Sequence, residues 1–561
     1  MNKILLSAVI IFGCLSCNTH KAKEISSDNY AQFDWFEYQG YDPVYESLEI
    51  AENEYLNPIL SGFYPDPSIV GVGDDFYLIN STFAYFPAIP IFHSKDLVNW
   101  TQIGHVLDRP EQCPFDSIGI SRGVFAPAIS YHNGTYYVVC TLVDCGGNFV
   151  VTAKDPAGPW SNPKFFSFEG IDPSLFFDED GKVYLVNNGA PEGTPLYQGH
   201  RAIWIQEFDP ENLEMTGPRK VLVNGGVDIS KKPVWIEGPH LYKTKGYYYL
   251  CSAEGGTSVD HSQVIFRSKN VWGPYKPWSK NPILTQRQLD PNRPDPVTCT
   301  GHMDMVETAA GEWWGVFLGC TPYEGDFYNT GRQTFLLPVN WTDDWPWVLK
   351  NDELVPYSHE KPDLPEQDTA PIPLNGNFTL RDDFNDSTLA MLYTFIRTPR
   401  EKWYTLENSR LNIKARSASI DSVSQPSLIG RRQQHHYGSA SASMRFVPVK
   451  EGEKAGLVIF QNEHNYYFLG LARKNGQDFI VLEKGSSDGP EEITDTPAET
   501  NGGKDLELKI ESRGKYYDFY YTVQPGTWTP LATDIDARYL STNKAGGFVG
   551  AIFGLYAYSP D

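Results

Sequence analysis

The sequence predicts an all-β protein, a five-bladed β-propeller followed by a β-sandwich, and three observations lead to this prediction. Aromatic residues make up 14% of the 561 residues and fall in short alternating runs, as in strands. One hairpin pattern, an apolar run, a Gly- or Asp-bearing turn and an aromatic strand, occurs five times before residue 350. Strand patterns continue after residue 377 without that repeat. Repeats that cannot bury their faces alone stack radially, as propeller blades do.

Each repeat places one residue at the start of the first strand of its blade, the strand nearest the axis. These five residues should therefore meet at one end of the central channel. Three carboxylates and a histidine are costly to desolvate side by side unless their interaction is used, so the sequence predicts a functional site there. The five are Asp66 in PDPSIV, Ala126 in FAPAIS, Asp172 in IDPSLFF, Glu237 in IEGPHLY and His302 in TGHMDMV.

The first residues, MNKILLSAVIIFGCLSC, have one lysine before an apolar run and then small residues, which is typical of a secretory signal. Cys17, with Cys14 as the other candidate, resembles the lipidated cysteine of bacterial lipoproteins. Residues 1–17 are thus expected to be a lipoprotein signal peptide, and cleavage elsewhere with loss of Cys17 is the alternative. The NTHK that follows lacks an acidic run, which favours an exported, lipid-anchored protein on the periplasmic side over the cell surface.

The remaining chain divides into four predicted segments. Residues 18–54 are a tether that includes an aromatic stretch, and residues 55–350 are the propeller. Prolines and charges mark a linker over 351–377, and residues 378–561 are a sandwich of jelly-roll type. Connections between blades are where ligand contacts are expected, and three of them are long: 108–122, 187–201 and 285–299.

The formal net charge of −24 would repel nucleic acid and an anionic membrane surface. A neutral ligand such as a sugar is expected, and a membrane is reached only through the lipid anchor. The downstream cysteines show no CxxC motif and no Cys/His zinc spacing. Buried free thiols are expected, with a disulfide as the alternative, at Cys113, Cys140, Cys145, Cys251, Cys299 and Cys320.

Hydrolysis of an acetal needs a proton for the leaving oxygen and a nucleophile for the anomeric carbon, and two carboxyl groups supply both. A third carboxylate nearby raises the pKa of the acid by like-charge repulsion and can orient it. The three predicted axial carboxylates suit this chemistry.

The motifs NPILSGFYPDPSI, GIDPSLFFDEDGKVYLV, IEGPHLY and CTGHMDMV, in this order, resemble glycoside hydrolase family 43, the five-bladed arabinofuranosidases and β-xylosidases. The resemblance covers nearly all of the chain after the signal. It implies that Asp66 is the general base that activates water and Glu237 the general acid, while Asp172 tunes and positions Glu237. It also implies inversion of configuration, and no cofactor for the chemistry.

Five further residues are candidates through the same resemblance. His302 matches an axial histidine often linked through waters to a calcium or sodium ion, and a structural histidine without an ion is the alternative. Arg332, in GRQTFLLP, resembles the arginine that reaches the hydroxyls of the terminal sugar, with a surface ion pair as the alternative. Phe125 stands where a tryptophan wall is common. Phe83 is another candidate wall, with core packing as the alternative, and Phe548 is a candidate for a loop that closes the pocket.

The C-terminal unit resembles the concanavalin-like sandwich of exo-acting family members. Such sandwiches typically finish with a strand like ADFDWFRY, whereas this chain finishes with GLYAYSPD and carries AQFDWFEY over 31–38. An unpaired sandwich edge would be an aggregation hazard. The strand over 31–38 is therefore predicted to complete the sandwich.

The resulting prediction is an exo-acting, inverting hydrolase that releases terminal non-reducing α-L-arabinofuranosyl residues from hemicellulose side chains or oligosaccharides. A β-D-xylosidase is the close alternative, because the choice of arabinose rests on overall resemblance and on Phe125. A non-catalytic glycan-binding lipoprotein is the third hypothesis, which would not require both an acid and a base. Oligomeric state is left open.

Overall fold

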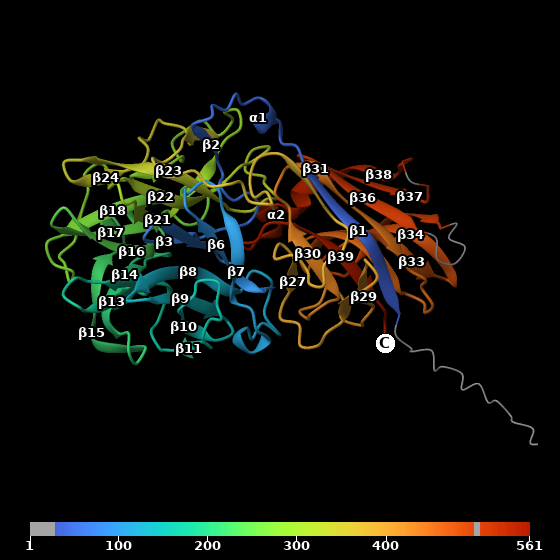
Figure 1. Ribbon diagram of the computed structural model, residues 1–561, viewed down its shortest axis with the longest axis horizontal. Coiled ribbons are helices and arrows are strands. Elements are labelled where there is room, and N and C mark those ends of the chain that lie inside the picture. Colours follow the sequence, from blue (N-terminus) through green and yellow to red (C-terminus); the bar gives the residue numbers. More distant parts are fainter. Residues whose placement is uncertain (1–28, 499–504, 525) are drawn as a thin grey trace, which may run out of the picture.

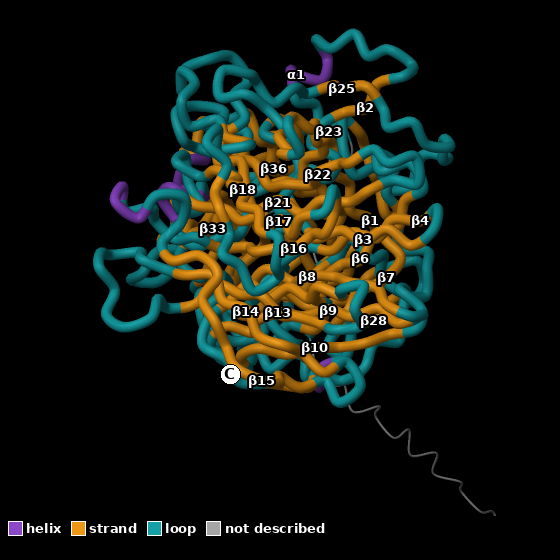
Figure 2. The backbone as a smooth tube through the Cα atoms, turned by 90° about the vertical axis from the view of Figure 1, so that its left-hand side faces the viewer, coloured by secondary structure: helices purple, strands orange, loops and turns teal. Residues whose placement is uncertain are grey.

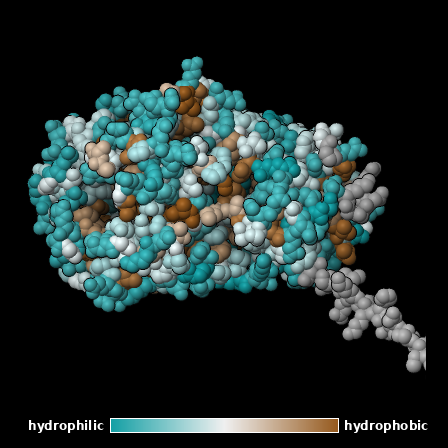
Figure 3. Space-filling view, viewed as in Figure 1, coloured by the Kyte–Doolittle hydropathy of each residue, from teal (hydrophilic) through white to brown (hydrophobic). Residues whose placement is uncertain are grey.

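The computed structural model describes residues 29–498, 505–524 and 526–561. The predicted signal peptide, with Cys14 and Cys17, lies outside the described residues. Two all-β units lie along the long axis, the propeller at the left of Figure 1 and the sandwich at the right. No helix in the described ranges is long and apolar enough to cross a membrane. On the face drawn in Figure 3, apolar side chains form small separate patches over both units.

The propeller has five antiparallel blades, and Figure 2 views this end of the molecule. The blades are β3 (Ser68–Val72), β4 (Asp75–Ile79), β6 (Ala88–Ser94) and β7 (Thr101–Leu107); β8 (Gly123–His132), β9 (Thr135–Val143), β10 (Gly147–Ala153) and β11 (Lys164–Phe165); β12 (Ile171–Phe177), β13 (Val183–Gly189), β14 (Ala202–Asp209) and β15 (Glu214–Asn224); β16 (Glu237–Thr244), β17 (Tyr247–Glu254), β18 (Ser262–Ser268) and β19 (Lys276–Pro277), with β20 (Leu284–Thr285) on β18; and β21 (Thr298–Glu307), β22 (Trp313–Cys320), β23 (Gln333–Thr342) and β24 (Trp345–Trp347).

The first strands of the blades, β3, β8, β12, β16 and β21, contact one another around the ring. Buried hydrogen bonds close it between the first and last blades. Asp304 of β21 accepts the hydroxyl of Ser68 at 2.7 Å and the backbone N–H of Ile69 at 2.9 Å. It also accepts the hydroxyl of Tyr242, from the fourth blade, at 2.6 Å. One carboxylate thus joins three blades.

The starts of these strands are irregular. The ladders of β8, β12, β16 and β21 each shift register within their first residues. Asp66, Asp172 and His302 lie in the left-handed region, with φ of 51°, 54° and 52°. Such bulges re-aim a side chain away from the ladder. They turn the residues at the strand starts towards the channel.

The sandwich consists of two facing sheets. One has the order β28 (Tyr404–Leu406), β29 (Leu411–Lys414), β1 (Tyr30–Gly40), β31 (Tyr437–Arg445), β36 (Leu506–Arg513), β37 (Tyr516–Thr522) and β38 (Thr529–Asp536), with β26 (Phe378–Asp382) also on β1. The other has the order β35 (Glu491–Pro497), β34 (Gln477–Lys484), β33 (Asn465–Lys474), β32 (Lys454–Asn462), β39 (Ile552–Tyr558), β30 (Leu428–Arg432), β27 (Thr394–Ile396) and β5 (Tyr85–Phe86).

The strand expected over 31–38 is β1, and it lies inside the sandwich (Figure 1). It pairs along its length with β31 on one side, and with β29 and then β26 on the other. Residues 31–38 thus pair with C-terminal strands, as the sequence argument required, but they lie between two neighbours and not at an edge. Because β1 is paired on both sides, it holds the sheet together rather than finishing it.

A bulge in β1 explains how three aromatic residues that are not in simple alternation share one face. The pairing with β31 shifts register between Phe33 and Trp35. As a result Phe33, Phe36 and Tyr38 are all buried between the sheets, whereas Trp35 is half-buried beneath the Arg381 guanidinium.

The two units share a sheet. Strand β5 belongs to the first-blade segment of the chain but pairs with β27 of the sandwich, placing Phe86 opposite Phe395. The segment after β1 crosses between the units through the short helix α1 (Pro43–Glu46), and β2 (Glu54–Leu56) then pairs with β25 (Ser358–Glu360) inside the predicted linker. The other short helix, α2 (Thr542–Ala545), lies in the sandwich chain just before Phe548. All six cysteines of the described ranges are free, and only Cys145 is not fully buried.

Candidate active site

A cavity of about 280 Å³ opens where the first strands begin. This is smaller than the roughly 300–1,000 Å³ of drug-sized ligand sites, so it fits a ligand the size of one sugar ring. A larger cavity of about 520 Å³ lies between α1 and the 291–296 loop, and none of the axial carboxylates lines it. The smaller cavity is lined by Asp66, Phe83, Phe125, Ala126, Ile171, Asp172, Val234, Trp235, Glu237, Gly256, Thr257, His302, Arg332 and Phe548.

Asp66 is held as a carboxylate. Its Oδ1 lies 2.7 Å from Nη1 of Arg332, and its Oδ2 accepts the hydroxyl of Ser81 at 2.7 Å. Burial alone would raise the pKa of Asp66, but Arg332, His302 and the Ser81 hydrogen bond outweigh it and lower the pKa below its usual value. An ionised carboxylate that accepts hydrogen bonds can take a proton from water.

The surroundings of Glu237 favour its protonated form. It is the first residue of β16 and is buried, and burial together with the charges of Asp172 and Asp66 raises its pKa well above the usual value. Burial and the charge of Asp66 likewise raise the pKa of Asp172 to about 7, against the lowering effect of the Gly238 N–H, which donates to Asp172 Oδ2 at 3.2 Å. The site therefore pairs a carboxyl group of lowered pKa with one of raised pKa, as acid–base chemistry with two carboxyl groups requires.

His302 lies beside the acids on β21, and burial lowers its pKa to about 4, so its ring is neutral. Gly238 makes room for it, because a Cβ there would lie 3.0 Å from the ring. Within the described ranges, no three or more His, Cys, Asp or Glu side chains gather in a way that could hold a metal ion. A hard cation prefers oxygen ligands, and these residues do not fit one bound directly. A water-linked ion stays a prediction, and no step below uses it.

Three phenylalanine rings form one wall of the cavity. Phe83 packs against Phe125 at 5.5 Å and stacks on Phe548 at 6.0 Å, while Phe125 and Phe548 meet edge to face at 5.6 Å. The Arg332 guanidinium lies 5.8 Å from the Phe83 centroid and 5.7 Å from that of Phe548. Arg332 therefore faces the aromatic wall as well as the base, and it is buried rather than part of a surface pair.

Phe548 comes from the sandwich, and its loop reaches into the propeller. The backbone N–H of Phe548 donates to the Ser121 hydroxyl at 3.0 Å. The next residues run against the loop that precedes Arg332. Ala551 N–H donates to the carbonyl of Asn329 at 2.7 Å, and a Cβ on Gly550 would lie 2.7 Å from the Thr330 backbone. The sandwich thus supplies a wall of the cavity and packs against the segment that carries the arginine.

Five lining residues were not singled out from the sequence: Ile171, Val234, Trp235, Gly256 and Thr257. Trp235 and Val234 form the wall beside Glu237, and Thr257 lies 3.5 Å from Arg332 through its hydroxyl. The signal for Trp235 was present, because it stands two residues before Glu237 in VWIEGPH. His261 was missed as well: its Nδ1 hydrogen-bonds the Cys299 carbonyl, and its Nε2 lies 4.0 Å from Glu237 Oε1.

The long connections between blades do not line the cavity, contrary to the sequence-based expectation. The 108–122 connection contributes Ser121, which holds the Phe548 loop, and the 187–201 connection supports Trp235. The 285–299 connection lines the larger cavity instead. The blades already project the strand starts into the channel, so the lining comes from those starts and from short segments beside them.

Comparison with known proteins agrees with this geometry. The family described as "Glycosyl hydrolases family 43" matches residues 55–346, and the "Beta xylosidase C-terminal Concanavalin A-like domain" matches residues 381–561. A "Xylosidase/arabinosidase" of Butyrivibrio fibrisolvens is 40% identical over 510 residues, 90% of this chain and 95% of that protein.

Two more relatives bear on the sugar. The "Non-reducing end alpha-L-arabinofuranosidase BoGH43B" of Bacteroides ovatus is 38% identical, covering 91% of this chain and 92% of that protein. A "Xylan 1,3-beta-xylosidase" of a Vibrio species is 34% identical, covering 86% and 92%. Among solved structures, a GH43_12 protein from a capybara gut metagenome has a TM-score of 0.86 at 42% identity, covering 94% of this chain and 99% of that one.

Proposed function

The chain belongs to glycosyl hydrolase family 43, and within that family we propose that it is an exo-acting, inverting enzyme that removes terminal non-reducing α-L-arabinofuranosyl residues from hemicellulose side chains or oligosaccharides. One observation carries the proposal: a single small cavity holds Asp66 with a lowered pKa and Glu237 with a raised one. Acid and base are therefore both ready at neutral pH.

In the proposed reaction Asp66 removes a proton from water while the water oxygen bonds to the anomeric carbon. The bond from that carbon to the leaving oxygen breaks, and Glu237 gives the leaving oxygen its proton. Attack from the face opposite the leaving group inverts the configuration. The step ends with Asp66 protonated and Glu237 ionised, and exchange with solvent resets both. Proton NMR of the first-formed sugar should show the β-anomer from an α-arabinofuranoside, and retention would contradict the mechanism.

The exo assignment is supported by the size of the cavity and by Phe548, which closes it from the sandwich side. The arabinose assignment is supported by the relative named as an arabinofuranosidase, whereas the name of the Butyrivibrio relative gives both activities. The alternative is a β-D-xylosidase, which the name of the Vibrio relative favours. Both sugars are neutral pentoses, and no nucleic acid partner is expected of so acidic a chain.

Release of nitrophenol from the two aryl glycosides decides between them. We expect the α-L-arabinofuranoside to have the higher kcat/KM. A β-D-xyloside turned over at least tenfold faster would establish the alternative. Inactivity on both glycosides and on natural hemicelluloses, together with measurable sugar binding, would instead support a glycan-binding protein.

Substrates with different leaving groups distinguish the proposed acid, Glu237, from the proposed base, Asp66. Removing either group should cost roughly 10²–10⁴-fold in turnover on a sugar leaving group. A dinitrophenolate leaves without protonation, so E237Q should recover most of its activity on a dinitrophenyl glycoside, whereas D66N should stay impaired on both substrates. Equal losses for E237Q on the two substrates would contradict its role as the acid.

We also propose that the protein is exported, lipid-anchored at Cys17 and periplasmic. The sequence pattern MNKILLSAVIIFGCLSC supports this proposal. Protease added to intact cells should leave the protein uncut, and rapid digestion would place it on the outer surface.

A further inference from the structure

The wall of the cavity beside Glu237 differs from the phenylalanine wall. It is made by Trp235, which is half-buried, and Val234, whose exposed fraction is 46%. The general acid donates its proton to the oxygen of the departing sugar, so that sugar lies on the side of Glu237. A sugar departing on this side would therefore meet an indole and an exposed apolar side chain.

The backbone that carries Trp235 is pinned to its neighbours. Trp235 has φ of 56°, a left-handed conformation that is unusual for a bulky residue. Its N–H donates to the Gly199 carbonyl at 2.8 Å, and the Val234 carbonyl accepts the Gly255 N–H at 2.8 Å. The Tyr197 hydroxyl donates to the Pro233 carbonyl at 2.8 Å. Contacts from two connections therefore hold the indole at the rim.

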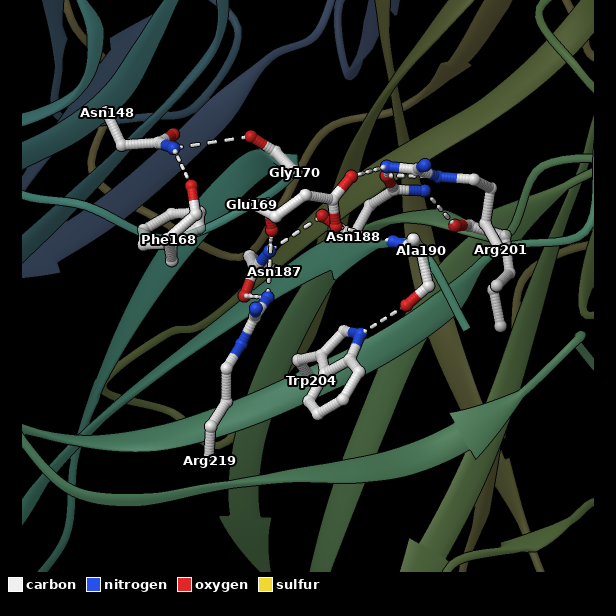
Figure 4. A network of polar contacts seen from close by, with 11 residues as sticks. Asn148, Phe168, Glu169, Gly170, Asn187, Asn188, Ala190, Arg201, Trp204 and Arg219 are labelled. Carbon is white, nitrogen blue, oxygen red and sulfur yellow. Dashed lines mark hydrogen bonds and ion pairs between the residues drawn. The ribbon is translucent and has the colours of Figure 1, made fainter. Parts of the chain in front are cut away.

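An arginine side chain packs against the indole of Trp235. The Arg201 guanidinium lies 5.0 Å from the Trp235 ring centroid. Figure 4 shows the polar contacts that hold Arg201: its Nε and Nη2 donate to Asn188 Oδ1 at 3.1 and 2.9 Å, and Nη2 lies 3.3 Å from Glu169 Oε1. The arginine thus has two partners and only 17% of its side chain exposed. Such pairing fixes its plane.

The same network reaches the acid. Asn188 Nδ2 donates to the carbonyl of Ile236, the residue between Trp235 and Glu237, at 2.5 Å. Glu169 is in turn held by the Ala190 N–H at 2.6 Å. One buried amide therefore couples the position of Arg201 to the segment that carries both the indole and the acid.

We propose that Trp235, braced by Arg201, is the stacking platform for the sugar that leaves, and that it selects the aglycone. The C–H face of a neutral sugar ring packs on an indole, and a fixed cation against the ring favours one orientation of that indole. This inference rests on the proposed glycosidase function. It assigns recognition of the second sugar to Trp235, separately from recognition of the terminal sugar by Arg332 and the phenylalanine wall.

The third blade, whose strand β14 directly follows Arg201, offers a matched control pair. The Arg219 guanidinium lies 4.4 Å from the Trp204 ring centroid, and Trp204 Nε1 donates to the Ala190 carbonyl at 2.8 Å (Figure 4). Trp204 does not line the cavity. A W204A variant removes an arginine-stacked indole from the same network without touching the rim.

The experiment compares W235A, W235F and W204A in the full chain. Substrates are oligosaccharides with a terminal pentose and at least one further sugar, and free arabinose and xylose serve as inhibitors of the terminal-sugar site. We expect W235A to raise KM for the oligosaccharides about tenfold, W235F to raise it less, and both to leave the inhibition constants of the free pentoses within twofold. W204A should change neither quantity.

The R201M variant tests whether Arg201 holds the Trp235 indole in place. We expect it to raise the oligosaccharide KM several-fold in the wild type and to raise KM no further in W235A, because Arg201 braces Trp235. The charge of Arg201 also lowers the pKa of Glu237, so that effect is read separately, from the basic limb of kcat/KM. Parallel changes in oligosaccharide KM and free-pentose inhibition would place Trp235 in the terminal-sugar site and overturn the proposal. So would an unchanged KM in W235A, or an equal rise in W204A. Wild-type protein that hydrolyses none of the substrates would refute the glycosidase function itself, which is a separate result.

Discussion

Nη1 of Arg332 lies 2.7 Å from Oδ1 of Asp66, and both side chains are buried. The same guanidinium faces Phe548, which belongs to the sandwich. One cation therefore lowers the pKa of Asp66 and contacts the sandwich loop that lines the cavity. The two units of the chain meet beside Asp66, the proposed base.

The first prediction concerns this pair. Arg332 lowers the pKa of Asp66, so R332M should raise it, and the base should be protonated at higher pH. The acidic limb of the kcat/KM profile should then move to higher pH, with a lower maximum. Arg122 is a control, because it lies over Phe125 at 5.6 Å but pairs with Asp144. R122M should leave the acidic limb in place, and an unmoved limb in R332M would contradict the pairing.

The second prediction concerns Asp172. Its charge raises the pKa of Glu237, so D172N should lower that pKa and the acid should lose its proton at lower pH. The basic limb of kcat/KM should move to lower pH while the acidic limb, assigned to Asp66, moves little. If the basic limb stays where it is in the wild type, Asp172 does not tune the acid.

The third prediction tests closure by the sandwich. F548A should raise KM several-fold and leave the pH limbs unchanged, because the lost ring is uncharged and packs on Phe83 and Phe125. F553A is a comparison within the same segment: Phe553 is buried in the sandwich core, so its loss should lower the melting temperature rather than KM. An unchanged KM in F548A would show that the loop does not close on the substrate.

The fourth prediction concerns β1. Phe33 and Phe36 are buried between the sheets, and truncation of either should cost about 3–5 kcal/mol of stability. W35A should cost less, because Trp35 lies half-exposed under Arg381. Deleting residues 18–38 should make the sandwich aggregate. Denaturant unfolding measures the stability lost on truncation of Phe33, Phe36 or Trp35. A variant lacking residues 18–38 that keeps the wild-type melting temperature would contradict the role of β1.

The axial site could be read from the sequence because the repeat couples each strand start to a turn and a second strand. This register placed Asp66, Asp172, Glu237 and His302 at one end of the channel, and all four line the cavity. Aromatic content and the family resemblance likewise indicated β1. Its central place in the sheet could not be read, because that depends on pairing with β29 and β26 as well as β31.

Other features depend on contacts that leave no local trace. Trp235 faces the cavity through a left-handed backbone and an arginine from another blade, and neither follows from the period of a strand. The pairing of β5 with β27 joins residues that the sequence assigns to different domains. The bulge after Phe33 changes which aromatic residues share a face. Simple alternation misassigns such positions.

The central position of β1 also determines when its sheet can be completed during synthesis. Tyr38 hydrogen-bonds His435, which lies 397 residues later in the chain. Synthesis of that stretch takes roughly 20–80 s at about 5–20 residues per second. All five blades, residues 68–347, are synthesised within this interval, so the propeller can be complete before β1 has its partner β31. Phe548 follows later still, so the cavity wall that the sandwich contributes is complete only when almost the whole polypeptide has been made.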